Sequence, residues 1–233
     1  MTFGRGVRDG LAIGLGYLSV SFSFGIMAVN CGLSWWQAVL VSVANLTSAG
    51  QVAGVGIMAA SGSFIEMAVS QLVINMRYSL MAISLSQKTD KTMNFPARLI
   101  GSYIITDEIF GVACSKDSVG FGYMTGLGVL PVAGWTLGTL LGAVCGNILP
   151  SVVTNSLAIG IYGMFVAIVL PVCRKHKTIA SICAISVLLS VVMRYVPVLH
   201  AHVSSGFAII ICAVISALIG VFFMPLKEAE DGQ

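Results

Sequence analysis

Charged side chains are scarce in this chain. Only 9% of its 233 residues are charged, whereas 57% are hydrophobic. A soluble globular domain carries about a quarter charged residues, so this composition excludes a water-soluble protein. The net charge of +3 gives no reason to expect a nucleic-acid partner. What the sequence has in abundance is apolar runs long enough to cross a lipid bilayer.

Cysteine, histidine and catalytic motifs are equally sparse. The six cysteines are scattered with no CxxC spacing, and the three histidines fall between the apolar runs. This pattern predicts no disulfide framework, no metal site and no cofactor. A GxSxG elbow, an HExxH zinc pair and a GxxxxGK[ST] phosphate loop are all missing. The chain is therefore predicted not to be an enzyme, and no ATP site is expected in it.

The apolar runs predict an all-α, polytopic integral membrane protein, since a spanning helix needs about 20 apolar residues. Runs that predict six full transmembrane helices lie at 11–30, 64–85, 99–114, 156–172, 179–193 and 205–223. Two interrupted runs, 35–60 and 121–149, make a total of seven to eight apolar segments. No stretch resembles a soluble domain, so residues 1–233 are predicted to form a single transmembrane domain.

Basic residues predict the topology, because cytoplasmic loops of membrane proteins carry an excess of Lys and Arg. The clusters are Arg5 and Arg8; Lys88, Lys91 and Arg98; Arg174, Lys175 and Lys177; and Lys227. If all eight apolar segments cross the membrane once, the basic 88–98 loop lies on the side away from the cytoplasm. If 35–60 and 121–149 each enter and leave on one face, every cluster and both termini become cytoplasmic. We favour this second interpretation, in which two segments are broken or re-entrant.

Small and polar residues supply the two breaks. The segment "NLTSAGQVAG", residues 45–54, either packs helices closely or exposes backbone groups and Gln51 to a ligand. The second break is predicted around Pro131, with Gly126 and Gly128. A stripe of glycines also follows at four-residue spacing, which predicts close approach of another helix, internal or from a partner subunit. These helix-packing residues are Gly134, Gly138, Gly142 and Gly146.

Ionisable residues inside the apolar runs are the strongest functional candidates, because a charge at the bilayer centre usually pairs or faces water. Arg77 precedes Lys88 by eleven residues, and Asp107 follows Arg98 by nine. At ~1.5 Å per helical residue both lie roughly 14–16 Å below one membrane surface. We therefore predict an Arg77–Asp107 ion pair, which either holds two helices together or binds a substrate.

Glu108 and Glu66 are the candidate proton carriers. Glu108 follows Asp107 directly, about 100° away around a helix, so only one of the two can face Arg77. Burial of an unpaired carboxylate raises its pKa, which favours these two residues over a paired Asp107 as carriers. Glu66 lies near a predicted helix end and alternatively only reaches the membrane interface.

Several motifs together resemble the AzlC family of branched-chain amino acid permeases. In order they are "SFSFGIMAVNCGLS", "AGQ", "NMRYSLMAISL", "TDE" and "WTLGTLLGAVCG", which span nearly the whole chain. Residues that match the family pattern are Gln51, Arg77, Thr106, Asp107 and Glu108. Three positions depart from it: Tyr78 replaces a usual histidine, Ser48 a common glycine and Ser19 a common proline. Tyrosine does not titrate near neutral pH, so a proton relay at position 78 is in doubt.

This resemblance implies a multi-pass permease of the bacterial cytoplasmic (inner) membrane. It would export leucine, isoleucine, valine or methionine together with a small AzlD-type membrane protein. The alternatives are a scaffolding subunit and a permease for another small zwitterion. The candidate substrate-binding or coupling residues are Gln51, Arg77, Asp107, Glu108, Asn75, Ser48, Gly50 and Thr106.

Overall fold

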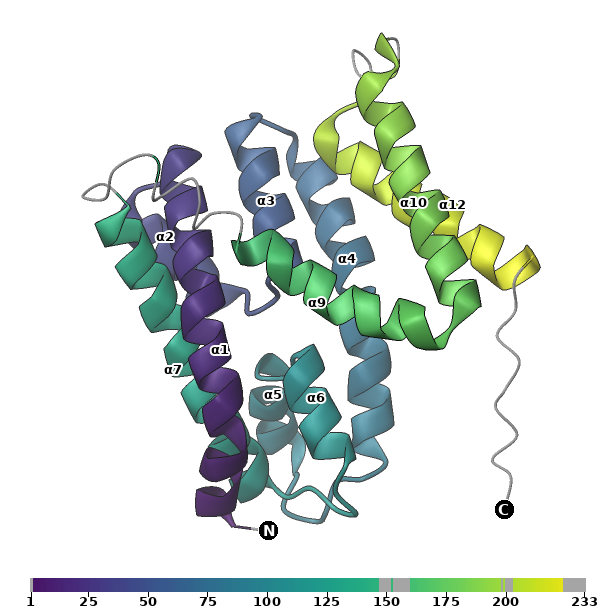
Figure 1. Ribbon diagram of the computed structural model, residues 1–233. Helices are drawn as coiled ribbons and strands as arrows, with labels where there is room; N and C mark the ends of the chain where they lie inside the picture. The colour runs from purple at the N-terminus through teal and green to yellow at the C-terminus, as the bar shows by residue number, and fades with distance from the viewer. Residues whose placement is uncertain (1, 147–151, 153–159, 198, 200–202, 224–233) are drawn as a thin grey trace. The chain divides into compact units, whose positions relative to one another are not determined.

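The computed structural model describes residues 2–146, 152, 160–197, 199 and 203–223, and the described part is helical. The cytoplasmic position predicted for the C-terminus lies outside the described residues. The helices are α1 (Phe3–Asn30), α2 (Trp35–Ala44), α3 (Ala49–Ala59), α4 (Phe64–Ser86), α5 (Phe95–Tyr103), α6 (Asp107–Cys114), α7 (Phe121–Cys145), α9 (Gly160–Lys175), α10 (Lys177–Tyr195) and α12 (Ser205–Phe223) (Figure 1).

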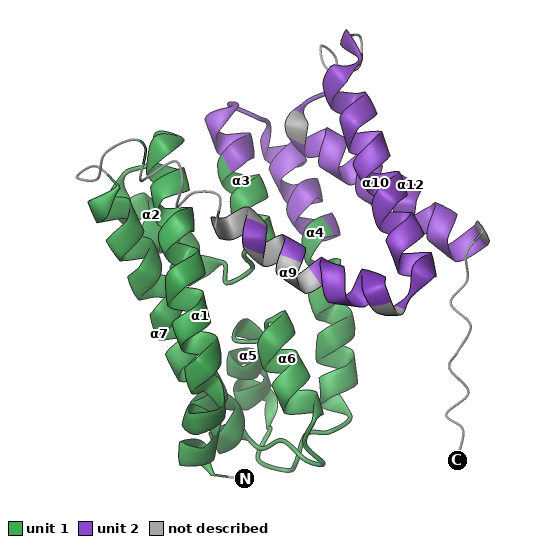
Figure 2. Cartoon of the chain, in the orientation of Figure 1, with its two compact units in different colours: residues 1–55, 74–162 green, residues 56–73, 163–233 purple. Residues whose placement is uncertain are grey.

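The chain divides into two compact units (Figure 2). Unit 1 comprises residues 1–55 and 74–162, and unit 2 comprises residues 56–73 and 163–233. The two are interleaved along the chain, because α3 and α4 each contribute to both. The single domain predicted from the sequence stays a prediction, and each unit is described by itself below.

Helices α1 and α7 form the scaffold of unit 1 and pack along most of their lengths. Their contact is made of glycines: a Cβ at Gly134, Gly138 or Gly142 of α7 would overlap a backbone carbonyl of α1. Gly10 and Gly25 of α1 lie equally close to the backbone of α7. The neighbour of the predicted glycine stripe is therefore internal to the chain. Gly146 is looser, since a Cβ there would lie 3.4 Å from the nearest Ile26 side-chain atom.

The first predicted break is confirmed, between α2 and α3. Helix α2 starts in a capping box, in which Gln37 Oε1 accepts from the backbone N–H of Ser34 at 2.8 Å. It ends at Ala44 with Asn45 as its C-cap, and Ser48 then adopts a positive φ of 31°. Gln51 Nε2 donates to Ser42 Oγ at 2.9 Å. Nine residues of straight helix would separate these two by about 13 Å, so the chain folds back at the break.

The second predicted break is wrong, because α7 runs without interruption through Pro131. The proline removes only the bond to the Leu127 carbonyl, and that carbonyl lies against Gly10 of α1. Packing on α1 keeps the helix continuous, and the glycines serve close approach rather than a break.

The run 99–114, predicted as one span, is the segment that breaks. Helix α5 ends at Tyr103, and α6 starts at Asp107 with Thr106 as its N-cap. Thr106 Oγ1 accepts from the backbone N–H of Ile109 at 3.4 Å. The two carboxylates of the first turn also suit a helix N-terminus, where the exposed N–H groups attract negative charge.

The two broken segments of unit 1 enter it from opposite ends (Figure 1). Helix α2 follows the C-terminal end of α1, whereas α5 and α6 join loops at the end where α1 begins. These loops contact each other, since Val119 N donates to Lys88 O at 2.8 Å. The tips of the two segments meet, because the Tyr103 hydroxyl donates to the Val43 carbonyl at 2.6 Å.

One end of unit 1 carries all of its basic residues except Arg77, and we call it the basic end. Lys116, in the loop after α6, forms an ion pair with Asp9 of α1 at 3.0 Å, so both loops and the start of α1 lie together. The basic end carries Arg5, Arg8, Lys88, Lys91, Arg98 and Lys116.

Candidate functional site

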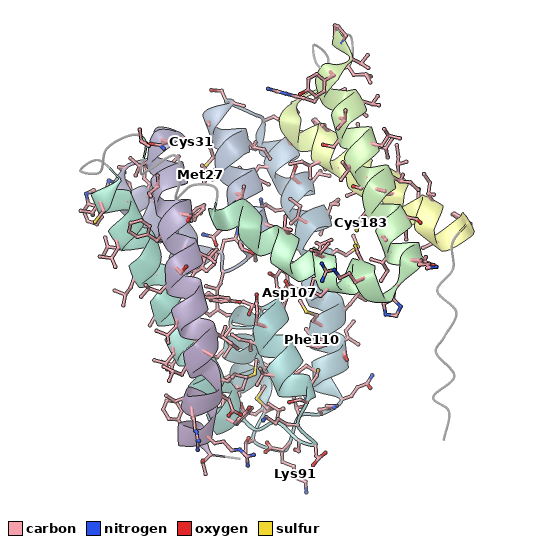
Figure 3. The ribbon with its side chains drawn as sticks, viewed as in Figure 1. Met27, Cys31, Lys91, Asp107, Phe110 and Cys183 are labelled. Carbon is pink, nitrogen blue, oxygen red and sulfur yellow. The ribbon has the colours of Figure 1, made fainter. Side chains whose placement is uncertain are left out.

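The predicted ion pair between Arg77 and Asp107 is present. Arg77 Nη1 lies 2.6 Å from Asp107 Oδ2, which joins α4 to the first turn of α6. Figure 3 labels Asp107 at the start of α6. The side chains remain 41% and 30% exposed, so neither charge is sealed inside the protein. The Tyr78 ring lies beneath the guanidinium, 5.1 Å from its carbon, in a cation–π contact.

Glu108 faces a different helix from Asp107, as expected for adjacent helical residues. Its carboxylate accepts a hydrogen bond from the Tyr17 hydroxyl of α1. The same hydroxyl lies 2.6 Å from Thr106 Oγ1. Thr106 and Tyr17 are buried, whereas Glu108 is half-buried. The start of α6 therefore holds one carboxylate on Arg77 and the other on the α1 scaffold.

Gln51 is held by both ends of its amide. Its Oε1 accepts from Trp135 Nε1 at 2.9 Å, and its Nε2 donates to Ser42 Oγ. Ser42 in turn lies 2.7 Å from Thr139 Oγ1 on α7. All four side chains are buried, and only 1% of Gln51 is exposed. This arrangement suits positioning of the first break better than direct contact with a ligand.

Aromatic contact joins the two networks. The rings of Tyr17 and Trp135 meet edge to face, with centroids 5.2 Å apart. Both broken segments are thus tied to one place on α1 and α7, the α2–α3 break through Gln51 and the start of α6 through Tyr17. A shift of either segment relative to α1 and α7 must break at least one of these buried contacts.

The other candidates in unit 1 lie around this cluster. Gly50 is buried in the first turn of α3, two residues after Ser48. The positive φ of Ser48 explains physically why glycine suits that position. Asn75 is half-buried on α4, two residues before Arg77 and so on a different face of the helix. The role predicted for these three residues in substrate binding stays a prediction.

Glu66 belongs to unit 2, whereas Arg77 belongs to unit 1. It is 4% exposed, and its Oε1 accepts from Ser204 Oγ at 2.5 Å and from the backbone N–H of Gly206 at 2.9 Å. The carboxylate therefore caps the start of α12. This geometry supports a structural role, and a role as proton carrier stays a prediction.

Sequence reasoning missed Tyr17, Ser42, Trp135 and Thr139. Each is a neutral residue inside an apolar helix, where the same residue types also serve ordinary helix packing. Only the tertiary structure shows that they meet Gln51 and Glu108. Among the residues that the structure describes, no three His, Cys, Asp or Glu side chains gather in a way that could hold a metal ion.

These features define a class of protein: a polytopic helical membrane protein with a polar, charged cluster where broken helices meet. Three of the described helices, α1, α7 and α10, are long and apolar enough to cross a membrane, and shorter apolar helices accompany them. The chain belongs to the AzlC protein family, which matches residues 12–149. The recognition made from the sequence motifs is therefore confirmed.

Curated relatives agree with a membrane protein. The chain is 25% identical over 231 residues to "Inner membrane protein YgaZ" of Escherichia coli K12, covering 95% of this chain and 92% of that protein. It is 28% identical over 171 residues to an uncharacterized membrane protein of Archaeoglobus fulgidus, covering 72% and 75%. No solved structure matches the chain.

Proposed function

We propose that this chain is the large subunit of a secondary transporter. It exports branched-chain amino acids across the bacterial cytoplasmic membrane together with a small AzlD-type membrane protein. The observation that carries the proposal is the partly exposed Arg77–Asp107 pair at the start of a broken helix. Membership of the AzlC family supports it, and so does the placement of binding sites at broken helices in many transporters.

An amino acid zwitterion has the same two charges as this ion pair. Its carboxylate matches the Arg77 guanidinium in a bidentate geometry, and its ammonium group matches the Asp107 carboxylate. Substrate binding therefore exchanges the internal pair for two pairs with the ligand, and neither side chain is left with an unmatched charge. Because α6 begins at Asp107, this exchange also changes what holds α6 to α4.

Glu108 is suited to coupling rather than to holding the substrate. It is bonded to Tyr17 and not to Arg77, so its proton occupancy changes the tie between α6 and α1. A protonated Glu108 loses the charge that makes this hydrogen bond strong. Under the proposal, transport by a Glu108→Gln protein becomes insensitive to an imposed pH gradient while exchange of substrate continues.

The decisive experiment is reconstitution in liposomes with and without the small partner, followed by counterflow of labelled leucine, valine and methionine. Arg77→Gln and Asp107→Asn are each expected to abolish counterflow. The Arg77→Met, Asp107→Leu double variant replaces the pair by apolar side chains of similar size, which often preserves folding. We expect it to remain folded and inactive.

A scaffolding role predicts the opposite result for that double variant. If the ion pair only holds α4 to α6, apolar packing replaces it and counterflow survives. Lys91→Gln, in the exposed loop at the basic end, is the control for loss of a cation and should transport normally. Counterflow of other zwitterions without leucine or valine would reassign the substrate but leave the transporter class intact.

A further inference from the structure

A narrow groove runs along unit 1 between the last turns of α4 and helix α5. Its volume is about 370 Å³. Met93 and Met124 line it and are buried, at 7% and 0% exposure. Ile83 and Leu99 also line it but are about 60% exposed, at 61% and 57%. An apolar groove with exposed apolar walls, on a protein that spans a membrane, faces hydrocarbon.

The shape of the groove favours a thin occupant. A whole α-helix is about 10–12 Å across, so it could place only the side chains of one face in the groove. An extended acyl chain is much thinner and can lie along the groove in contact with the exposed apolar walls formed by Ile83 and Leu99.

One end of the groove carries a fixed positive charge. Arg98 of α5 lines it, with Nε donating to the Met93 carbonyl at 2.9 Å and Nη2 to Thr89 Oγ1 at 3.4 Å. Both acceptors are neutral, so the guanidinium keeps its full charge. Within the described residues, the ion pairs use Arg77 and Lys116 but not Arg98. The hydrogen bonds orient the guanidinium beforehand, which favours bidentate recognition of a phosphate.

We propose that this groove binds one anionic phospholipid, with an acyl chain along Ile83 and Leu99 and the phosphate on Arg98. The basic end of unit 1 surrounds the headgroup with further positive charge, Lys91 included. Basic pockets at the cytoplasmic ends of membrane helices bind anionic headgroups in this way. The site is distinct from the Arg77 cluster and does not depend on the transport proposal.

The test is native mass spectrometry of the purified full chain with phosphatidylglycerol or phosphatidylcholine added at equal concentration. We expect the wild-type protein to retain one phosphatidylglycerol in preference to phosphatidylcholine. Arg98→Gln should lower phosphatidylglycerol retention about fivefold, the effect of one basic residue at a membrane surface. Lys177→Gln is the control for loss of a cation, since Lys177 is exposed, belongs to unit 2 and does not line the groove, and it should retain the preference.

Ser102→Phe tests whether the lipid occupies the groove, and it leaves the charge of Arg98 unchanged. Ser102 is an exposed lining residue, so the larger ring should fill the groove and abolish retention of either lipid in a folded protein. Equal retention of both lipids by the wild type would overturn the proposal. Two further results would also overturn it. One is binding of glycerophosphoglycerol alone as tightly as the whole lipid. The other is displacement of the lipid by the small partner protein, together with cross-linking of that protein to Phe95.

Discussion

Gln51 illustrates how single buried side chains hold the broken segments in place. Its amide connects Ser42 on α2 to Trp135 on α7, and every polar atom of that link is buried. A buried polar group that loses its partner is destabilising, because it loses a hydrogen bond to protein without gaining one to water. Gln51 therefore matters most for where the first break lies.

Trp135→Phe should lower the free energy of unfolding by about 1–3 kcal/mol, because it leaves Gln51 Oε1 without its donor. The measurement is thermal or denaturant unfolding of the protein in detergent. Trp36→Phe is the control, since Trp36 is 53% exposed, and should have little effect. Equal stability of the two variants would contradict a structural link through Gln51.

Ser48→Gly should raise the free energy of unfolding by up to about 1 kcal/mol. A non-glycine residue at positive φ is strained, and Ser48 has a φ of 31°. Ser84→Gly serves as the comparison, because Ser84 lies exposed inside α4 and glycine weakens a helix there. A melting temperature that falls in both variants would show that Ser48 is not strained.

At the scale of elements, the contact between α1 and α7 is the rigid part of unit 1. Glycines on both helices bring the two backbones together, and the polar networks at Gln51 and Tyr17 are attached to that surface. The broken segments are shorter helices that pack on this pair, for example through Ile109 of α6, which is buried in one cluster with Leu127 of α7. Under the proposed function, we expect a rearrangement of unit 1 to take place in the broken segments, with α1 and α7 as the fixed frame.

Gly142→Ala should destabilise the protein by about 1–3 kcal/mol, since its methyl group would overlap the Phe22 carbonyl on α1. Gly122→Ala on the same helix is the matched control, because the nearest atom to a Cβ there lies 3.9 Å away. It should be neutral or slightly stabilising. Unfolding in detergent measures the stability of both variants. Similar losses of stability in the two would mean that helix propensity, and not the contact with α1, determines the effect of alanine.

At the scale of the whole molecule, the charge distribution predicts the orientation in the membrane. The basic end of unit 1 should face the cytoplasm, because basic loops are retained there. In a variant without its native cysteines, Lys91→Cys should react with a membrane-impermeant maleimide only after the cells are opened. Leu33→Cys, in the turn between α1 and α2, should react in intact cells. The reverse labelling pattern would show that the protein has the opposite orientation in the membrane.

Much of the candidate site was predictable because charges in apolar helices have few alternatives to pairing. Arg77 and Asp107 lie at matching depths from the same loop, and this was enough to pair them. The positions of the breaks were harder. Pro131 and its neighbouring glycines favour a break locally, but close packing on α1 keeps α7 helical. Thr106 followed by two carboxylates is an N-cap pattern, and it was interpreted only as charge inside a continuous helix.

The sequence by itself determined the class of the protein, the break before Gln51 and the companion of Arg77, because hydrophobicity, small residues and isolated charges act over short stretches of chain. Only the tertiary structure decided that 99–114 breaks and 121–145 does not, that Glu108 bonds to Tyr17, and that Gln51 is enclosed. Those outcomes depend on which helices lie against one another, and residues such as Tyr17 and Trp135, 118 positions apart, carry no local sign of their contact.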